Sequence, residues 1–356
     1  MSDLLYSEVE EDLRASVRAL LTDRAAPAAV LARTESGDPV DAKLWRALAE
    51  LGVTGLPVPE RLGGSGASWR ETAVVLEELG RAVAPVPFFG SAVLATAALL
   101  AVGDETLLPD IASGAKTAAL AVPFSAAPGT APEKLTVVDE HLNGSITTVA
   151  DALLADVYLA PAGGTLYAVD ASDVTRTPVV SLDQTRPVAD LRFDGASGRA
   201  LGPAGPALER ALTVGAAMLA AEQLGVAQWC LDTTVEYVKT RRQFARQIGS
   251  YQAIKHRLAD LWVAITEARA VSRYAADCLA TDDPDTPVAA ALAQAFCGPV
   301  AVKAAEECVQ LHGGIGFTWE HPAHLYLKRA KSSAVALGSP DRHRLALAEL
   351  VNLDYT

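Results

Sequence analysis

Residues 241–262 read RRQFARQIGSYQAIKHRLADLW and join two long segments with helical periodicity. Three arginines (Arg241, Arg242 and Arg246) fall within six residues of a chain whose formal net charge is -13. Arginines beside the start of a helix suit a diphosphate, because guanidinium groups donate in pairs and the helix N-terminus offers free N–H groups. A solvated basic turn without a ligand is the alternative interpretation. In both cases the stretch predicts two long helices joined by a short turn.

The segments around this stretch predict a helical bundle. The helix before it runs from about 206 to 242, and the helix after it from about 251 to 281. A third helix is expected from just after residue 285 to the glycines at 313–314, and a fourth after the HPAH sequence at 321–324. Four antiparallel helices with short connections are typical of a bundle, here assigned to residues 204–356.

The chain before the bundle divides into two further domains. Residues 115–203 alternate short apolar runs such as TAALAV, TLYAVD and ADLRFDG with turn residues, which predicts a central antiparallel β domain. The LNG sequence at 142–144 is expected to form a tight hairpin turn. Residues 1–114 have helical periodicity, with a helix over about 41–51 and another opened by the capping pair Ser68 and Glu71. The predicted fold class is therefore α+β, with three domains.

Composition excludes several classes of protein. Half of the residues are hydrophobic and 21% are charged, which is a globular composition. The excess of acidic residues disfavours nucleic acid and anionic membranes as partners. No basic and apolar leader opens the chain, and the four scattered cysteines are expected to be reduced core residues, so a cytoplasmic location is expected. The uncharged stretch 82–103 contains several prolines and glycines and predicts a buried helix over about 90–102 rather than a membrane span.

A second glycine-rich stretch, VQLHGGIGF at 309–317, follows the third bundle helix. Three glycines in four residues let a ligand or another backbone come close, although glycine turns are also common helix C-caps. No strand precedes the stretch, so it is not a dinucleotide-binding loop of the Rossmann type.

Together, the two stretches and the order of domains resemble the acyl-CoA dehydrogenase family. RRQFARQIGSYQAIKHRLADLW is similar to the family signature R-x-x-F-G-x-x-I-x-x-[FY]-Q-x-x-x-x-x-L-A-D, and the 309–317 stretch to Q-x-x-G-G-x-G-[FY]. The resemblance extends from about Leu44 to the C-terminus. It implies an N-terminal helical domain, a central β-barrel and a C-terminal four-helix bundle. It also implies that the protein binds FAD and forms an oligomer. The implied reaction is α,β-dehydrogenation of an acyl-CoA thioester, with electron transfer to an electron-transferring flavoprotein or a similar acceptor.

The resemblance also implies which residues bind the cofactor. In this family the C-terminal motifs contact the ADP half of the FAD held by a neighbouring subunit. Carried over by position, the cofactor-binding residues are Arg241, Gln243, Phe244, Gln252, Gln310, Gly313 and Gly314. Ala245 stands where the family usually has glycine. No metal site is expected, although Glu320, His321 and His324 lie close together in the sequence.

Other family features are missing. The T-E-P-x-A-G-S-D-like segment that holds the chain's own flavin is replaced by AVPFSAAPG at 121–129, and no aromatic residue occurs at 148–150. The two family positions for the catalytic glutamate are occupied by Gly215 and Leu337, neither of which can accept a proton. Glu222 is a weak candidate for an unorthodox base because it lies two helical turns after Gly215. Glu209, six residues before Gly215, and Asp341, four residues after Leu337, are further weak candidates, and the catalytic base is left unknown.

The C-terminal motifs that would serve a neighbouring subunit are present, whereas the features of the chain's own flavin site are missing. Three hypotheses follow from this contrast. The chain resembles the degenerate partner in heterotetrameric acyl-CoA dehydrogenases, some of which act on CoA-linked steroid side chains, and would lend half an FAD site to a subunit that carries the base. It is alternatively a self-sufficient homomeric dehydrogenase with an unorthodox base. A third possibility is a flavin-free scaffold or CoA-ester-binding protein.

Overall fold

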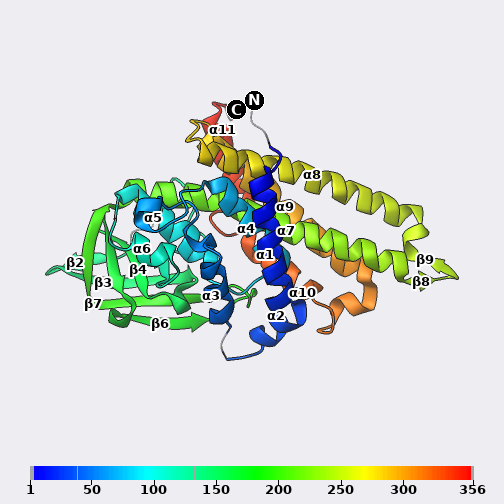
Figure 1. The fold of residues 1–356 in the computed structure, drawn as a ribbon, viewed down its shortest axis with the longest axis horizontal. Helices are drawn as coiled ribbons and strands as arrows, with labels where there is room; N and C mark the ends of the chain where they lie inside the picture. The colour runs from blue at the N-terminus through cyan, green and yellow to red at the C-terminus, as the bar shows by residue number, and fades with distance from the viewer. Residues whose placement is uncertain (1–3, 38, 131–133, 354–356) are drawn as a thin grey trace.

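The computed structural model describes residues 4–37, 39–130 and 134–353. Figure 1 shows a β-rich region at one end of the long axis and a helical bundle that extends to the other end. The helices before the sheet are α1 (Glu8–Arg24), α2 (Pro27–Thr34), α3 (Ala42–Glu50), α4 (Trp69–Ala82), α5 (Thr96–Val102) and α6 (Leu108–Ala112). The strands are β1 (Ala118–Leu120), β2 (Thr136–Val138), β3 (His141–Ala150), β4 (Val157–Ala162), β5 (Thr165–Asp170), β6 (Val174–Val179) and β7 (Val188–Pro203). The C-terminal elements are α7 (Ala204–Thr240), β8 (Arg242–Gln243), β9 (Arg246–Gln247), α8 (Gln252–Ala280), α9 (Thr286–His312), α10 (Ala323–Ser333) and α11 (Pro340–Leu350).

Two of the N-terminal helices begin with side-chain caps. The side chain of Asp41 accepts hydrogen bonds from the first backbone N–H groups of α3, and Ser68 and Glu71 form the expected capping box on α4. Gly52 follows α3 with a positive φ of 74°, a conformation that glycine adopts without a steric penalty. Helix α4 confirms the capping prediction, and α3 confirms the helix expected over about 41–51.

The uncharged stretch forms a buried helix, as predicted. It consists of the π-helix η3 (Phe89–Ala95) followed by α5, and every residue of η3 is buried. By length and composition, the segment Thr286–Phe317 is the one helix among the described residues that could cross a membrane. Within the structure, 67% of its apolar window is buried, which is typical of the core helix of a globular protein.

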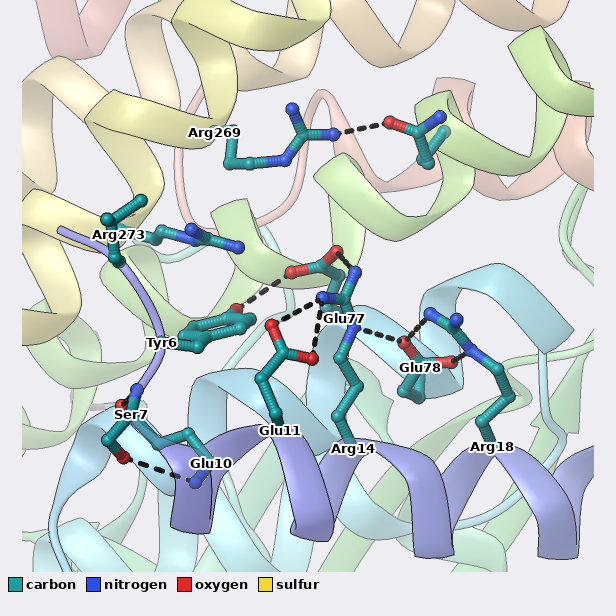
Figure 2. Close-up of polar contacts among 12 residues, drawn as sticks. Tyr6, Ser7, Glu10, Glu11, Arg14, Arg18, Glu77, Glu78, Arg269 and Arg273 are labelled. Carbon is teal, nitrogen blue, oxygen red and sulfur yellow. Dashed lines mark hydrogen bonds and ion pairs between the residues drawn. The ribbon is translucent and has the colours of Figure 1, made fainter.

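Helix α1 packs on α4 through an ionic layer. Arg14 pairs with Glu77 and Glu78 at 3.2 Å each, and Arg18 reinforces Glu78. The phenol of Tyr6 donates to Glu77 at 2.8 Å (Figure 2). Both glutamates are at least 98% buried, so their charges depend on these arginines for compensation.

Helices α4 and α7 cross at very close range through two glycines. A Cβ on Gly80 would lie 2.1 Å from the carbonyl oxygen of Glu222, and a Cβ on Gly225 would lie 1.9 Å from that of Glu77. Neither backbone could approach so closely past a side chain, so this pair of glycines sets the distance between the N-terminal domain and the bundle.

The central sheet is not the closed antiparallel barrel that was expected. In the described residues its seven strands run in the order β1-β4-β5-β7-β3-β2, with β6 paired to β7. The β1–β4 pair is parallel, and the remaining pairs in this sheet are antiparallel. The long strand β7 pairs with β3 and β6 along its first half and with β5 along its second half. The sheet therefore bends around its own apolar core, which includes Tyr158 and Phe193, without joining its two edges.

The hairpin prediction at 142–144 is wrong by three residues. The turn between β2 and β3 consists of Asp139 and Glu140, whose φ angles are 48° and 66°. Two consecutive positive φ angles make a two-residue turn that matches the right-handed twist of the strands. Leu142–Gly144 instead belongs to β3, next to an irregularity in its pairing with β7.

The bundle has the predicted order with one correction. Helices α7, α8 and α9 match the first three expected helices within a few residues, and α7 is 37 residues long. The expected fourth helix is two helices, α10 and α11, separated at residues 334–339. Pro340 and the positive φ angles of Leu337 and Gly338 explain the break, because none of these is compatible with a continuous helix.

Candidate functional site

The arginine-rich stretch forms an exposed hairpin at the far end of the bundle. Strands β8 and β9 pair in the register Arg242–Gln247 and Gln243–Arg246. Phe244 and Ala245 make the turn with φ angles of 50° and 63°. The left-handed conformation at Ala245 explains why the family signature has glycine at this position. A residue with a Cβ adopts this conformation at a steric cost of about 1 to 2 kcal/mol.

The glycine-rich stretch presents bare backbone to solvent. Gly313 ends α9 with a φ of 63° and begins the short helix η7 (Gly313–Phe317). No atom lies within 4 Å of a Cβ built on Gly313 or Gly314. Gly316 is different, because a Cβ there would lie 2.5 Å from the carbonyl oxygen of Val309. The first two glycines therefore leave room for an external group, whereas the third allows the turn to pack on α9.

The structure brings these two stretches together. The hydroxyl of Tyr237, near the end of α7, donates to the carbonyl oxygen of His312 at 3.2 Å. Beneath them lies a small separate core made by Val238, Ile248 and Leu311. All seven residues proposed to bind the cofactor are solvent-exposed at this end: Arg241, Gln243, Phe244, Gln252, Gln310, Gly313 and Gly314. We call this surface the exposed half-site. It is open, so a second molecule would have to cover a ligand bound to it.

The exposed half-site fits the ADP part of FAD chemically. It offers guanidinium groups and free backbone, which suit a diphosphate, and exposed aromatic residues beside them. Phe244 is 88% exposed and Phe317 is 76% exposed. Figure 1 places this hairpin at the opposite end of the long axis from the central sheet.

The segment expected to hold the chain's own flavin is instead occupied by contacts within the protein. Phe124 donates its N–H to the carbonyl oxygen of Thr148 at 3.0 Å and accepts from the N–H of Leu337 at 2.8 Å. Its ring packs edge-on against Phe89, with ring centroids 6.1 Å apart. Gly129 donates to the carboxylate of Glu209 at 2.8 Å. The backbone groups of this segment are thus bonded to the chain itself, and the residues present do not fit a flavin.

The two family positions for the base meet in space, and both are apolar. A Cβ on Gly215 would lie 2.5 Å from Leu94 Cδ2 and 2.9 Å from Leu337 Cδ1. Leu337 is fully buried and has a φ of 53°, which is unusual for a leucine. Gly215 and Leu337 are 122 residues apart in the sequence. In the structure they are neighbours, and the side chains of Leu94 and Leu337 fill the space beside Gly215.

Glu222 belongs to a buried ion network. Its carboxylate pairs with Arg186 and lies 3.2 Å from Arg329, while Arg329 also pairs with Asp183 at 2.6 Å. Burial by itself would raise the pKa of Glu222, but the two arginines outweigh it and hold the pKa below its usual value. A carboxylate stabilised in its charged form by two partners is a poor proton acceptor. No sequence signal identified this network, because its members are spread from the β6–β7 loop to α10.

The other weak candidates for a base lie apart from the buried positions. Asp341 is exposed in the first turn of α11 and pairs with Arg344 at 2.5 Å. Glu209 lines an open cavity of about 540 Å³ together with Thr213, Arg342 and His343. The cavity is mostly apolar in its walls and lies between α7, α9, α11 and the segment 127–129. No feature of the sequence predicted this cavity.

Histidines cluster beside the exposed half-site without an arrangement for a metal. The rings of His312 and His321 have centroids 4.1 Å apart. Burial, with the neighbouring histidines His312 and His324, lowers the pKa of His321 to about 4. In the part of the chain that the structure describes, no group of three or more His, Cys, Asp or Glu side chains could hold a metal ion.

Comparison with known proteins identifies similar chains along almost the whole length. Family models match at residues 7–115 (acyl-CoA dehydrogenase, N-terminal domain) and 206–351 (acyl-CoA dehydrogenase, C-terminal domain). Acyl-CoA dehydrogenase IpdE2 of Mycolicibacterium smegmatis is 42% identical over 335 residues, which cover 94% of this chain and 96% of the relative.

Two solved structures extend the comparison. The ChsE4-ChsE5 complex from Mycobacterium tuberculosis has a chain that matches with a TM-score of 0.89 and 28% identity over 100% of both chains. A variant of the Tcur3481-Tcur3483 steroid ACAD matches with a TM-score of 0.86 and 31% identity, over 97% of this chain and 98% of the other.

Proposed function

The chain belongs to the acyl-CoA dehydrogenase family of oxidoreductases, and on that premise we propose that it is one subunit of a heteromeric acyl-CoA dehydrogenase. In this proposal it lends the exposed half-site to an FAD held mainly by a partner subunit. The partner, a second member of the same family, supplies the catalytic carboxylate.

The contrast between the two ends of the molecule carries the proposal. The exposed half-site presents Arg241, three glutamines and bare glycine backbone, and all seven of its residues face solvent. The positions where a base would lie are occupied by Gly215 and Leu337, packed against Leu94. Such a chain exposes half of a cofactor site and has apolar residues where its own catalytic base would lie. It is therefore suited to assembly with a complementary subunit.

The names of similar proteins support a heteromer and a substrate class. One solved relative is described as a complex of two proteins, and another is described as a steroid enzyme. We therefore include in the proposal a CoA thioester of a steroid-derived or other lipid chain as substrate. We also include electron transfer to an electron-transferring flavoprotein or a similar acceptor, and a cytoplasmic location.

FAD, when bound, supplies the hydride acceptor for α,β-dehydrogenation. The residues of this chain then have a binding role. Arg241 and the N-terminus of α8 offer donors to the diphosphate, and Gly313 and Gly314 allow the cofactor to approach the backbone. Phe244 and Phe317 cover the site and exclude water at the junction between subunits. The proton transfer belongs to the partner's carboxylate.

The first test is the visible spectrum and solution mass of the chain, purified alone and together with a second acyl-CoA dehydrogenase family member from the same organism that carries the catalytic glutamate. A colourless chain alone and a yellow, stoichiometric complex are expected. A yellow homo-oligomer of this chain alone would overturn the proposal and favour a self-sufficient dehydrogenase. Absence of flavin in both preparations would favour a flavin-free scaffold or CoA-ester-binding protein.

The variant Arg241→Ala tests the exposed half-site in the complex. Loss of a charge-assisted contact to a diphosphate should weaken FAD retention about tenfold or more, since such bonds contribute about 1.5 to 3 kcal/mol. Arg192→Ala is a matched control, because Arg192 is 68% exposed in a side-chain pair on β7. Equal flavin content in the two variants would contradict the role assigned to Arg241.

A further inference from the structure

A recess of about 260 Å³ lies between the N-terminal helices and the bundle. Its walls come from α1, the turn between α1 and α2, the end of α4, and one residue each of α7 and α10 (Figure 1). Leu21 and Ala25, each 4% exposed, give the α1 side an apolar surface. Among the described residues, none of the seven that make up the exposed half-site lines this recess. It is therefore a separate feature that the proposed flavin chemistry does not use.

An aromatic pair forms another wall of the recess. Trp229 of α7 and Tyr326 of α10 stack face to face, with ring centroids 3.5 Å apart and an angle of 3° between the ring planes. Tyr326 is buried, and its hydroxyl donates to the carbonyl oxygen of Arg81 at 2.6 Å, which fixes the pair against α4. Trp229 is only partly buried, so its indole is available to a ligand. A flat, rigid wall of this kind suits an aromatic ring, because aromatic pairs gain from stacked or edge-on packing beyond the area they bury.

Two arginines from different helices line the same recess with unused donors. Arg18 of α1 donates from Nε and Nη2 to Glu78 at 2.8 and 2.5 Å (Figure 2). Arg81 of α4 donates from Nη1 to Asp232 at 2.9 Å. Within the described part of the chain, no hydrogen bond occupies Nη1 of Arg18 or Nε and Nη2 of Arg81. These nitrogens can therefore donate to an anion without loss of the existing ion pairs.

The acidic residues nearby leave this positive charge available. Glu78 also lines the recess, but it is 98% buried and is already neutralised by Arg18 and, at 3.2 Å, by Arg14. Asp232 is 47% exposed, and ion pairs at that exposure are weak because water screens them. The recess thus combines an apolar, flat wall with cationic donors, although the chain as a whole has a net charge of -13.

We propose that this recess binds a small aromatic carboxylate, with one ring or two fused rings. The ring packs on Trp229 and on the apolar surface of α1, and the carboxylate accepts hydrogen bonds from Arg81 and Arg18. The volume lies at the small end of the range for ligand pockets, so a whole CoA thioester or a flavin does not fit. The site requires neither flavin nor a partner subunit, so it is independent of the proposed function.

Calorimetric titration of the full chain with 2-naphthoate tests the proposal. We expect saturable binding at one site with a dissociation constant below about 1 mM. The neutral amide of the same shape, 2-naphthamide, should bind at least about tenfold more weakly, because it lacks the charge that the arginines recognise. Inorganic phosphate, which lacks a ring, should not displace 2-naphthoate. Absence of saturation at about 10 mM, or equal binding of the amide, would overturn the proposal.

Two arginine variants locate the bound carboxylate. Arg81→Gln should weaken binding of 2-naphthoate at least about tenfold. It should remain folded, because the ion partner that it loses, Asp232, is 47% exposed, and thermal unfolding checks this. Arg342→Gln is the matched control, since Arg342 is an exposed arginine that lines the larger cavity beside α11, and it should bind as the unmodified chain does. The reverse pattern would place the ligand in that cavity and overturn the proposal.

A spectroscopic measurement reports on the ring independently of affinity. Fluorine NMR of the chain labelled with 5-fluorotryptophan should give one resonance for each of its five tryptophans. The resonance that disappears in Trp229→Phe should shift when 2-naphthoate binds. Those of Trp262 and Trp319, which are 60% and 58% exposed and do not line the recess, should stay in place. Binding that leaves the Trp229 resonance unchanged would overturn the proposal.

Discussion

Leu337 is the residue on which the proposed lack of a catalytic base depends most directly. It stands at a family position for the base, adopts a φ of 53°, and is fully buried against the space beside Gly215. Its N–H donates to Phe124, which belongs to the segment that would otherwise face the flavin. The left-handed backbone at this position therefore carries an apolar side chain, which cannot accept a proton.

Ala245 is expected to be a strained residue whose replacement by glycine stabilises the protein. Ala245→Gly should raise the free energy of unfolding by about 1 kcal/mol, because its φ of 63° carries a steric penalty only for residues with a Cβ. Urea denaturation would measure this change. The control Ala259→Gly, at an exposed position in the interior of α8, should instead lower stability by about 1 kcal/mol. A decrease for both variants would contradict the assigned turn.

Glu222 is expected to be a structural residue with a defined pH dependence. Its folded pKa lies below the unfolded value, so its contribution to stability is complete above the ordinary glutamate pKa of about 4.3 and is lost as the pH falls through the folded pKa. Near neutral pH, Glu222→Gln should destabilise the chain by about 3 kcal/mol, since it leaves Arg186 and Arg329 less compensated.

Denaturation curves at neutral pH and at about pH 3 would test this dependence, because the difference between the two proteins should shrink in acid. Glu306→Gln is the control, since Glu306 is 54% exposed in a surface pair and should change stability by less than about 0.5 kcal/mol. A constant difference between Glu222→Gln and the unmodified chain at both pH values would contradict the ionic role.

At the scale of elements, the crossing of α4 and α7 is expected to tolerate no side chain. Gly225→Ala should destabilise the protein by about 3 kcal/mol or more, because its Cβ would overlap the backbone of α4. Gly205→Ala, in the same helix with no atom within 4 Å of the added Cβ, should be neutral or slightly stabilising. Thermal unfolding of both variants would distinguish a steric effect from a general glycine effect. Similar melting temperatures would disprove the close crossing.

For the whole molecule, assembly should depend on the far end of the bundle rather than on the sheet. Phe317→Ser should leave the isolated chain as stable as before, because the side chain is 76% exposed, but it should weaken association with the partner subunit. Val180→Ser is the control, since Val180 is fully exposed beyond the end of β6 in the central domain. Sedimentation of the mixed subunits would measure the difference, and equal association of both variants would contradict the proposed interface.

The sequence by itself determined the order of the domains, the capped helices α3 and α4, the buried helix around Phe89–Val102 and the two motifs of the exposed half-site. These features depend on local periodicity and on short motifs, which a linear pattern records directly. The tertiary structure alone decided that the sheet stays open, that the hairpin turn lies at Asp139 and Glu140, and that Gly215 and Leu337 meet. It also decided that Glu222 is bound by two arginines. Each of these depends on residues far apart in the sequence, whose contacts exist only once the helices and strands have packed.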